Sequence, residues 1–229
     1  MRRSLILLMA LPLLGQSHEE PKIETEPPIV ESGGGTSFPP WRLATQEPKP
    51  SFPWEKVSSF LGGVVAGLAI HETGHMGAGA ILGKDPYFTR TNSGVMPFFT
   101  VAYGKAPTND RQAFTLAAAG FWMQHAMAEA ILAKYPKVWR DAPPAVQGAF
   151  VFHLLTSLIY TYGALAKSGA PERDTLGMAR SLNVDERWMG VAILLPAALD
   201  LYRSFHPEAR WATWSSRGVK VGFVFGITR

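Results

Sequence analysis

The chain has 229 residues, enough for one domain with a full hydrophobic core, and 47% of them are hydrophobic while only 17% are charged. Its net charge of +4 is small and is not gathered into a basic stripe, so nucleic acid is not expected as a partner. The absence of cysteine excludes disulfides, a lipidated cysteine anchor, thiolate metal ligands and a cysteine nucleophile.

The N-terminal residues predict an exported segment without a core of its own. A basic start, an apolar run over residues 5–14 and small residues after it predict a signal peptide over residues 1–17. The run is shorter than the ~20 residues of a spanning helix, which leaves an uncleaved anchor as the alternative. Residues 18–53 are rich in Pro, Gly and Glu, lack apolar periodicity, and predict a disordered tether.

Four apolar stretches follow, and they predict a mainly α-helical, membrane-embedded bundle of about four transmembrane helices over residues 54–205. They cover residues 57–83, 112–133, 145–166 and 188–202. The first three are long enough to cross a hydrocarbon core of ~30 Å, and the fourth is marginal. Aromatic residues lie mostly near the predicted ends, as at a membrane interface: Trp54, Trp122, Trp139, Tyr160, Tyr202 and Trp211. The alternative is a soluble α-helical domain with very apolar helices.

Two segments outside these stretches predict β-structure. Alternation in YFTRTNSGVMPFFTVAYG, on both sides of the turn-forming Asn92-Ser93-Gly94, predicts a β-hairpin after the first helix. The tail over residues 206–229 alternates in SRGVKVGFVFGITR and predicts a short C-terminal strand. An outer-membrane barrel is not expected, because its strands would have to recur along the whole chain.

The first apolar stretch carries HETGH, an H-E-x-x-H pattern. On a helix, His71 and His75 lie one turn apart on one face, where neutral imidazoles can both coordinate a single Zn²⁺. Glu72 lies beside them and can take a proton from a metal-activated water. The pattern therefore predicts a zinc site with Glu72 as its catalytic base. The alternative is a pair of core histidines whose hydrogen-bonding groups are satisfied within the protein.

Small residues extend this face along the helix and predict that it points into the bundle. At a spacing of four residues the stripe consists of Gly63, Gly67, His71, His75, Gly79 and Gly83. Small side chains let a neighbouring helix approach closely. Ionisable groups at membrane depth are costly and usually have a function and a partner.

The segment HETGHMGAGAILGK resembles the site-2 protease family of intramembrane zinc metalloproteases, and a hairpin after this helix matches that family's layout. The family's G-P-x-x-N element is similar to AGFWMQ here, with Gly120 matching, Phe121 in place of proline and Gln124 in place of asparagine. The resemblance covers roughly residues 57–180. It implies that Gln124 holds an extended substrate and that an aspartate supplies the third zinc ligand.

A catalytic zinc normally has three protein ligands and one open position. Asp174 in SGAPERDTLGMARSL is the first choice for the third ligand, although Thr175 replaces the glycine of the family's D-G element. A helix N-cap is the competing role for Asp174. His125 and Glu129, one turn apart on the second helix, are alternative ligands or partners of a ligand. His153 is expected to be a hydrogen-bonded interior residue.

These features together predict an integral membrane protein, in a bacterial inner membrane with an exported tether, that hydrolyses peptide bonds of membrane-associated substrates. Its expected partners are the lipid bilayer and a membrane-protein or peptide substrate. The alternative is a non-catalytic membrane scaffold or metal-binding protein that retains the HExxH helix. A transporter is weaker, because four spans are few and no inverted repeat is visible.

Overall fold

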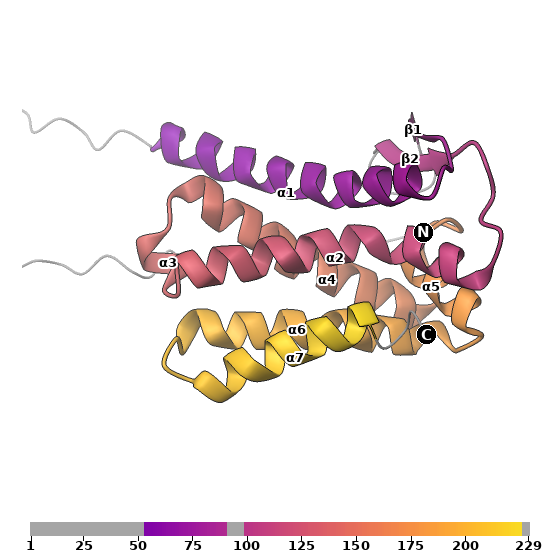
Figure 1. The fold of residues 1–229 in the computed structure, drawn as a ribbon. Helices are drawn as coiled ribbons and strands as arrows, with labels where there is room; N and C mark the ends of the chain where they lie inside the picture. Colours follow the sequence, from indigo (N-terminus) through magenta and orange to yellow (C-terminus); the bar gives the residue numbers. More distant parts are fainter. Residues whose placement is uncertain (1–52, 91–98, 226–229) are drawn as a thin grey trace, which may run out of the picture. The chain divides into compact units, whose positions relative to one another are not determined.

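A computed structural model describes residues 53–90 and 99–225. In chain order its elements are α1 (Trp54–Ile81), β1 (Pro86–Arg90), β2 (Phe99–Tyr103), α2 (Asp110–Lys134), α3 (Val138–Asp141), α4 (Pro144–Ala166), α5 (Asp174–Leu182), α6 (Glu186–Phe205) and α7 (Arg210–Phe225). The long helices lie alongside one another, with α1 packed on α2 and α4, and α6 packed on α4 and α7 (Figure 1). The predicted mainly helical fold is confirmed, and the four predicted apolar helices correspond to α1, α2, α4 and α6.

Glycines allow α1 and α4 to pack with their backbones in contact. A Cβ atom on Gly63 would overlap the backbone of Ala145, and a Cβ atom on Gly148 would overlap the backbone of Phe60. The predicted small-residue stripe of α1 is buried at Gly63, Gly67, His71, His75 and Gly79. Gly83 is not part of it, because the helix ends at Ile81 and Gly83 lies in the following turn with a φ of +65°. The stripe therefore brings both histidines to the bundle interior.

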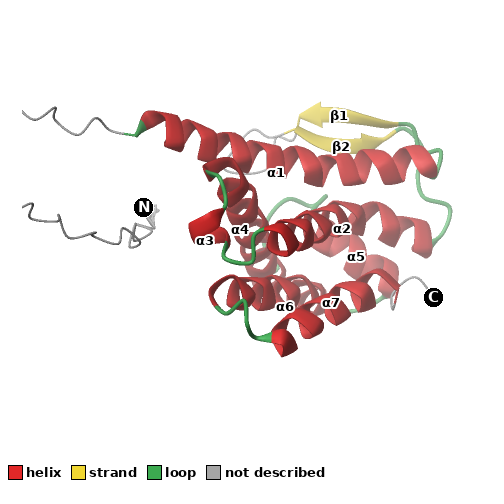
Figure 2. Cartoon of the chain, turned by 60° about the vertical axis from the view of Figure 1, so that its left-hand side comes forward, coloured by secondary structure: helices red, strands yellow, loops and turns green. Residues whose placement is uncertain are grey.

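The predicted hairpin is confirmed as an antiparallel pair in which Pro86 lies opposite Tyr103 and Arg90 opposite Phe99. The predicted turn at residues 92–94 lies outside the described residues. The pair lies beside the C-terminal half of α1 (Figure 2). Gly79 makes this contact possible, because a Cβ atom there would overlap the ring of Tyr103 and the side chain of Pro86.

The predicted C-terminal strand is wrong, because the described part of the tail forms α7. Its buried residues Ala212, Ser216, Lys220 and Phe223 recur at helical spacing and face the neighbouring helices. The prediction was wrong because valines in this segment alternate with a period of two residues, which is typical of a strand. A helix satisfies its backbone hydrogen bonds internally, whereas a strand needs a partner strand. The described part of the tail thus belongs to the helical unit that begins at Pro53.

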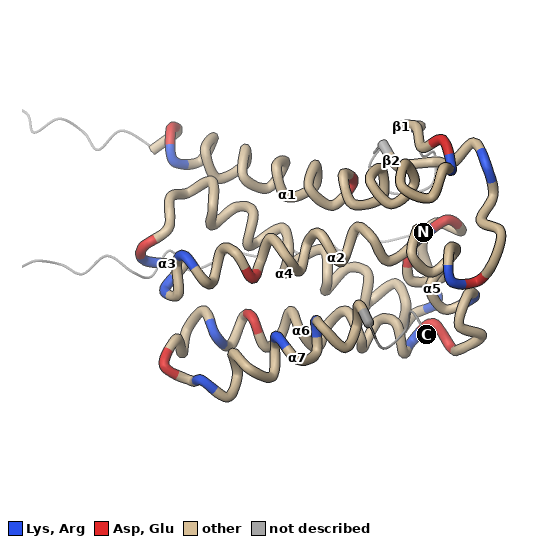
Figure 3. Tube along the Cα trace, viewed as in Figure 1, with Lys and Arg blue, Asp and Glu red and all other residues tan. Residues whose placement is uncertain are grey.

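One helix in the described part of the chain, α4, is long and apolar enough to cross a membrane by length and composition; four such spans are not confirmed. Charged residues are sparse along α1 and α4 and more frequent on α6 and α7 (Figure 3). The predicted signal peptide and tether, residues 1–53, lie outside the described residues except for Pro53.

Candidate metal centre

Three side chains from α1 and α5 converge inside the bundle. The Nε2 atoms of His71 and His75 are 3.2 Å apart, and Oδ2 of Asp174 lies 3.4 Å from each of them. Both histidines are buried, and the Asp174 side chain is 17% exposed. The three ligand atoms lie within 4.8 Å of one another, so this group could hold a metal ion.

The spacing of these three atoms fits a tetrahedral ion. Ligand atoms about 2.0–2.1 Å from a tetrahedral centre lie about 3.3–3.4 Å from one another, close to the observed separations. Nδ1 of His75 donates a hydrogen bond to the carbonyl oxygen of Leu116 over 2.8 Å, so a neutral His75 presents a lone pair at Nε2. That lone pair faces the other imidazole and a carboxylate, an arrangement that a cation between them stabilises.

Gly120 of α2 leaves room at this point. A Cβ atom on Gly120 would overlap Nε2 of both histidines. Any other residue would therefore place a carbon where the two imidazoles converge. The donor set of two nitrogens and one carboxylate oxygen is one that zinc accepts.

Asp174 is held in place by its neighbours in sequence. It is the first residue of α5, the N-cap position belongs to Arg173, and no side chain caps the helix. The N-cap role weighed for Asp174 is therefore wrong. On either side of it, Nε of Arg173 and Oγ1 of Thr175 each donate to Oε1 of Glu186 over 2.6 Å. Glu186, buried at the start of α6, thus fixes the start of α5 and the direction of Asp174.

Replacing Glu186 with alanine is expected to lower the metal affinity about 10-fold or more, the range found when groups that orient a metal ligand are lost. The reason is that Arg173 and Thr175 lose their common acceptor and the start of α5 is no longer fixed. Competition with a chromophoric zinc chelator measures the change. Glu172→Ala, at an exposed position in the turn that precedes α5, is the matched control and should bind as wild type. Equal affinity in both variants would contradict this role of Glu186.

Glu72 lies beside the three ligand atoms without being one of them. Its carboxylate interacts electrostatically with His71, His75 and Asp174, and it accepts a hydrogen bond from the backbone N–H of Val101 in β2. Its Oε2 atom is buried without a hydrogen-bond partner among the described residues. A buried carboxylate oxygen of this kind is available to accept a proton from a reacting water.

Two tyrosines border the site and were not identified as site residues from the sequence. Tyr160 of α4, expected at a membrane interface, instead has its ring 6.3 Å from that of His71, and its hydroxyl interacts electrostatically with Asp174. The hydroxyl of Tyr103 donates to the carbonyl oxygens of His75 and Leu116, each over 3.4 Å. Tyr103 thereby joins β2 to α1 and α2. No motif signals either tyrosine, because each reaches the site only through the packing of its element.

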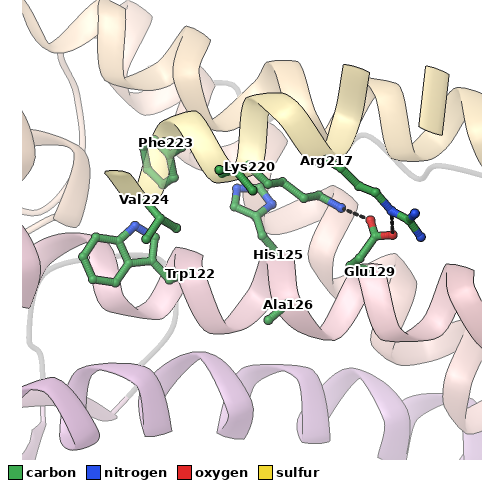
Figure 4. A pocket seen from close by; sticks show the side chains of 9 residues that line it. Trp122, His125, Ala126, Glu129, Arg217, Lys220, Phe223 and Val224 are labelled. Atoms are coloured by element: carbon green, nitrogen blue, oxygen red, sulfur yellow. Dashed lines mark hydrogen bonds and ion pairs between the residues drawn. The ribbon is translucent and has the colours of Figure 1, made fainter. Parts of the chain in front are cut away.

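The alternative ligands His125 and Glu129 belong to a different part of α2. They line a pocket between α2 and α7 together with Arg217 and Lys220 (Figure 4). Glu129 is fully engaged, since it accepts hydrogen bonds from Arg203, Arg217 and Lys220. Within the described ranges, neither residue is in the group that could hold a metal. These two residues are therefore not brought to the metal centre.

Two further polar side chains lie directly behind His71. Nδ1 of His71 donates to Oε1 of Gln124 over 3.1 Å, and Gln124 in turn contacts His153 of α4. Both Gln124 and His153 are 0% exposed. The prediction that His153 is a hydrogen-bonded interior residue is confirmed. Gln124 is buried and faces a candidate metal ligand.

Comparisons with protein-family models, with curated proteins and with solved structures found no match to this chain.

Proposed function

We propose that the protein is a membrane-embedded zinc metalloprotease in which His71, His75 and Asp174 hold the metal and Glu72 is the catalytic base. One observation carries the proposal. Three candidate ligand atoms from helices far apart in sequence converge at tetrahedral spacing, with an unpartnered carboxylate oxygen beside them. An H-E-x-x-H helix with a third carboxylate ligand is the arrangement of zinc peptidases.

The residues of the site have distinct roles in peptide hydrolysis. Zinc, when bound, lowers the pKa of a water ligand and polarises the scissile carbonyl. Glu72 accepts the proton of the attacking water at its free Oε2 atom and delivers it to the leaving amine. β2 borders Glu72 through the N–H of Val101, which supports an extended substrate that aligns with the hairpin before cleavage.

A membrane environment is supported by the outer faces of the helices. Exposed large apolar side chains recur along α1, α4 and α6: Leu61, Val65, Ile81, Leu155, Leu158, Ile159, Trp188, Val191 and Leu195. Large apolar side chains that recur on the outer faces of three helices support contact with the hydrocarbon of a bilayer. The bilayer is accordingly the proposed partner of this surface, and membrane-associated polypeptides are the proposed substrates.

Zinc stoichiometry of the detergent-purified protein tests the site directly. We expect one zinc per chain in wild type and less than about a tenth of that in His71→Ala and Asp174→Ala, because each variant leaves two ligands where a stable site needs three. His125→Ala is the matched control and should retain zinc. Wild-type protein that is folded yet takes up no zinc would contradict the proposal. Full zinc content without cleavage of any membrane peptide would identify the non-catalytic metal-binding alternative.

A further inference from the structure

The amide of Gln124 is hydrogen-bonded at both its oxygen and its nitrogen inside the protein. Its Oε1 atom lies 3.1 Å from Nδ1 of His71, and its Nε2 atom lies 3.1 Å from the carbonyl oxygen of His153 and 3.0 Å from Oγ of Ser157. Gln124 and Ser157 are both 0% exposed. Both amide hydrogens of Gln124 are thus directed at groups of α4, and its amide oxygen is directed at His71.

The surroundings of Gln124 determine which way its amide points. A carbonyl oxygen only accepts hydrogen bonds, so the atom facing the carbonyl of His153 must be the NH₂ group. The oxygen Oε1 then necessarily faces His71. An amide oxygen also only accepts, so Nδ1 of His71 must carry a proton, and in the neutral imidazole Nε2 is then bare.

We propose that Gln124 is the positioning residue of the metal centre, which holds His71 as the Nδ1–H tautomer with the lone pair of Nε2 directed at the metal. This inference rests on the proposed metal site, but it concerns a residue on α2 that binds neither metal nor substrate. The hydrogen bond from His71 to Gln124 parallels the one from His75 to the carbonyl oxygen of Leu116. Each imidazole therefore has one fixed acceptor for its Nδ1–H group. The two acceptors have different origins, one in the backbone and one in a side chain that mutation can change.

The amide of Gln124 is itself fixed by charged groups deeper in the bundle. Nε2 of His153 donates to Oδ2 of Asp200 over 3.2 Å, which leaves Nδ1 of His153 as an acceptor, 3.2 Å from Nε2 of Gln124. Asp200 is 0% exposed and is held by Arg203 and Lys220. A continuous chain of hydrogen bonds thus runs from His71 through Gln124 and His153 to Asp200. Each tautomer in the chain is set by the next group.

The test compares Gln124→Leu, which removes the acceptor, with Gln124→Glu, which retains an oxygen for Nδ1–H of His71. The first readout is the ¹⁵N NMR spectrum of the His71 ring in metal-free, detergent-solubilised protein at a pH where the imidazole is neutral. We expect the Nδ1–H form in wild type and in Gln124→Glu, and a mixture containing the Nε2–H form in Gln124→Leu. The second readout is zinc affinity by chelator competition, expected to fall about 10- to 100-fold in Gln124→Leu only.

The matched control is Gln147→Leu, which removes an amide bonded to the carbonyl oxygens of Val138, Trp139 and Ala142, away from the metal centre. It should lower thermal stability without changing the His71 tautomer or the zinc affinity. An unchanged tautomer and unchanged affinity in Gln124→Leu would overturn the proposal. The NMR measurement needs no metal. If the wild-type protein bound no zinc, the proposed function would be contradicted, but the NMR spectrum would still identify the tautomer of His71.

Discussion

Replacing Glu72 with glutamine is expected to reduce peptide cleavage about 10²–10⁴-fold while leaving the zinc content unchanged. A glutamine side chain has nearly the same shape but cannot take a proton from water at neutral pH, and loss of a general base costs about 10²–10⁴-fold in rate. Zinc is retained because Glu72 is outside the group formed by His71, His75 and Asp174. Cleavage is measured by mass spectrometry on a mixture of single-span membrane peptides reconstituted in the same detergent.

Glu55→Gln is the matched control, because it makes the same change in the first, exposed turn of the same helix. It should cleave at the wild-type rate. If Glu72→Gln cleaved as fast as the wild type, Glu72 would not be the base and the proposed mechanism would be wrong. A variant that lost its zinc as well would place Glu72 among the ligands.

Substitution of Gly120 by alanine is expected to abolish zinc binding, although alanine is the better helix former by about 1 kcal/mol. The added methyl group would overlap Nε2 of both His71 and His75 and so displace the ligand atoms from tetrahedral spacing. We expect the affinity for zinc to fall more than about 100-fold, because two of three ligands are disturbed at once. Inductively coupled plasma mass spectrometry and chelator competition measure the loss.

Gly77→Ala provides the comparison, since a Cβ atom on Gly77 of α1 meets nothing within 4 Å. This variant gains the same helix propensity near the site and should keep its zinc. Wild-type zinc affinity in Gly120→Ala would show that the metal, if bound, lies elsewhere than between the two imidazoles. Equal losses in both variants would point to a general disturbance of helix packing.

The sequence was most informative where one local pattern determines both structure and chemistry. HETGH and the glycines around it predicted the helix, its buried face and the convergence of both histidines on the interior, all of which depend on i, i+4 geometry within α1. The hairpin was predictable for a similar reason, because alternating strands around a turn are a local signal.

Features that depend on tertiary packing were harder to predict. Asp174 could be proposed as a ligand, but its anchoring by Glu186 depends on the contact between two helices separated by a turn. Tyr160 looks interfacial in sequence and is placed beside His71 only by the packing of α4 against α1. The helix α7 was mistaken for a strand because residues of high β-propensity alternate in it, and tertiary context decided the outcome.

Two features of the site affect when it can form during synthesis of the chain. Glu186 joins α5 to α6, and Asp174 lies far along the sequence from the two histidines. About 100 residues lie between His75 and Asp174, and at 5–20 residues per second a ribosome needs roughly 5–20 s to synthesise them. During that interval the nascent chain carries two imidazoles and the glutamate but lacks the carboxylate that completes the metal site. The proposed metal site would therefore be complete only after the ribosome has passed α5 and the start of α6, when most of the helices around the site have already been made.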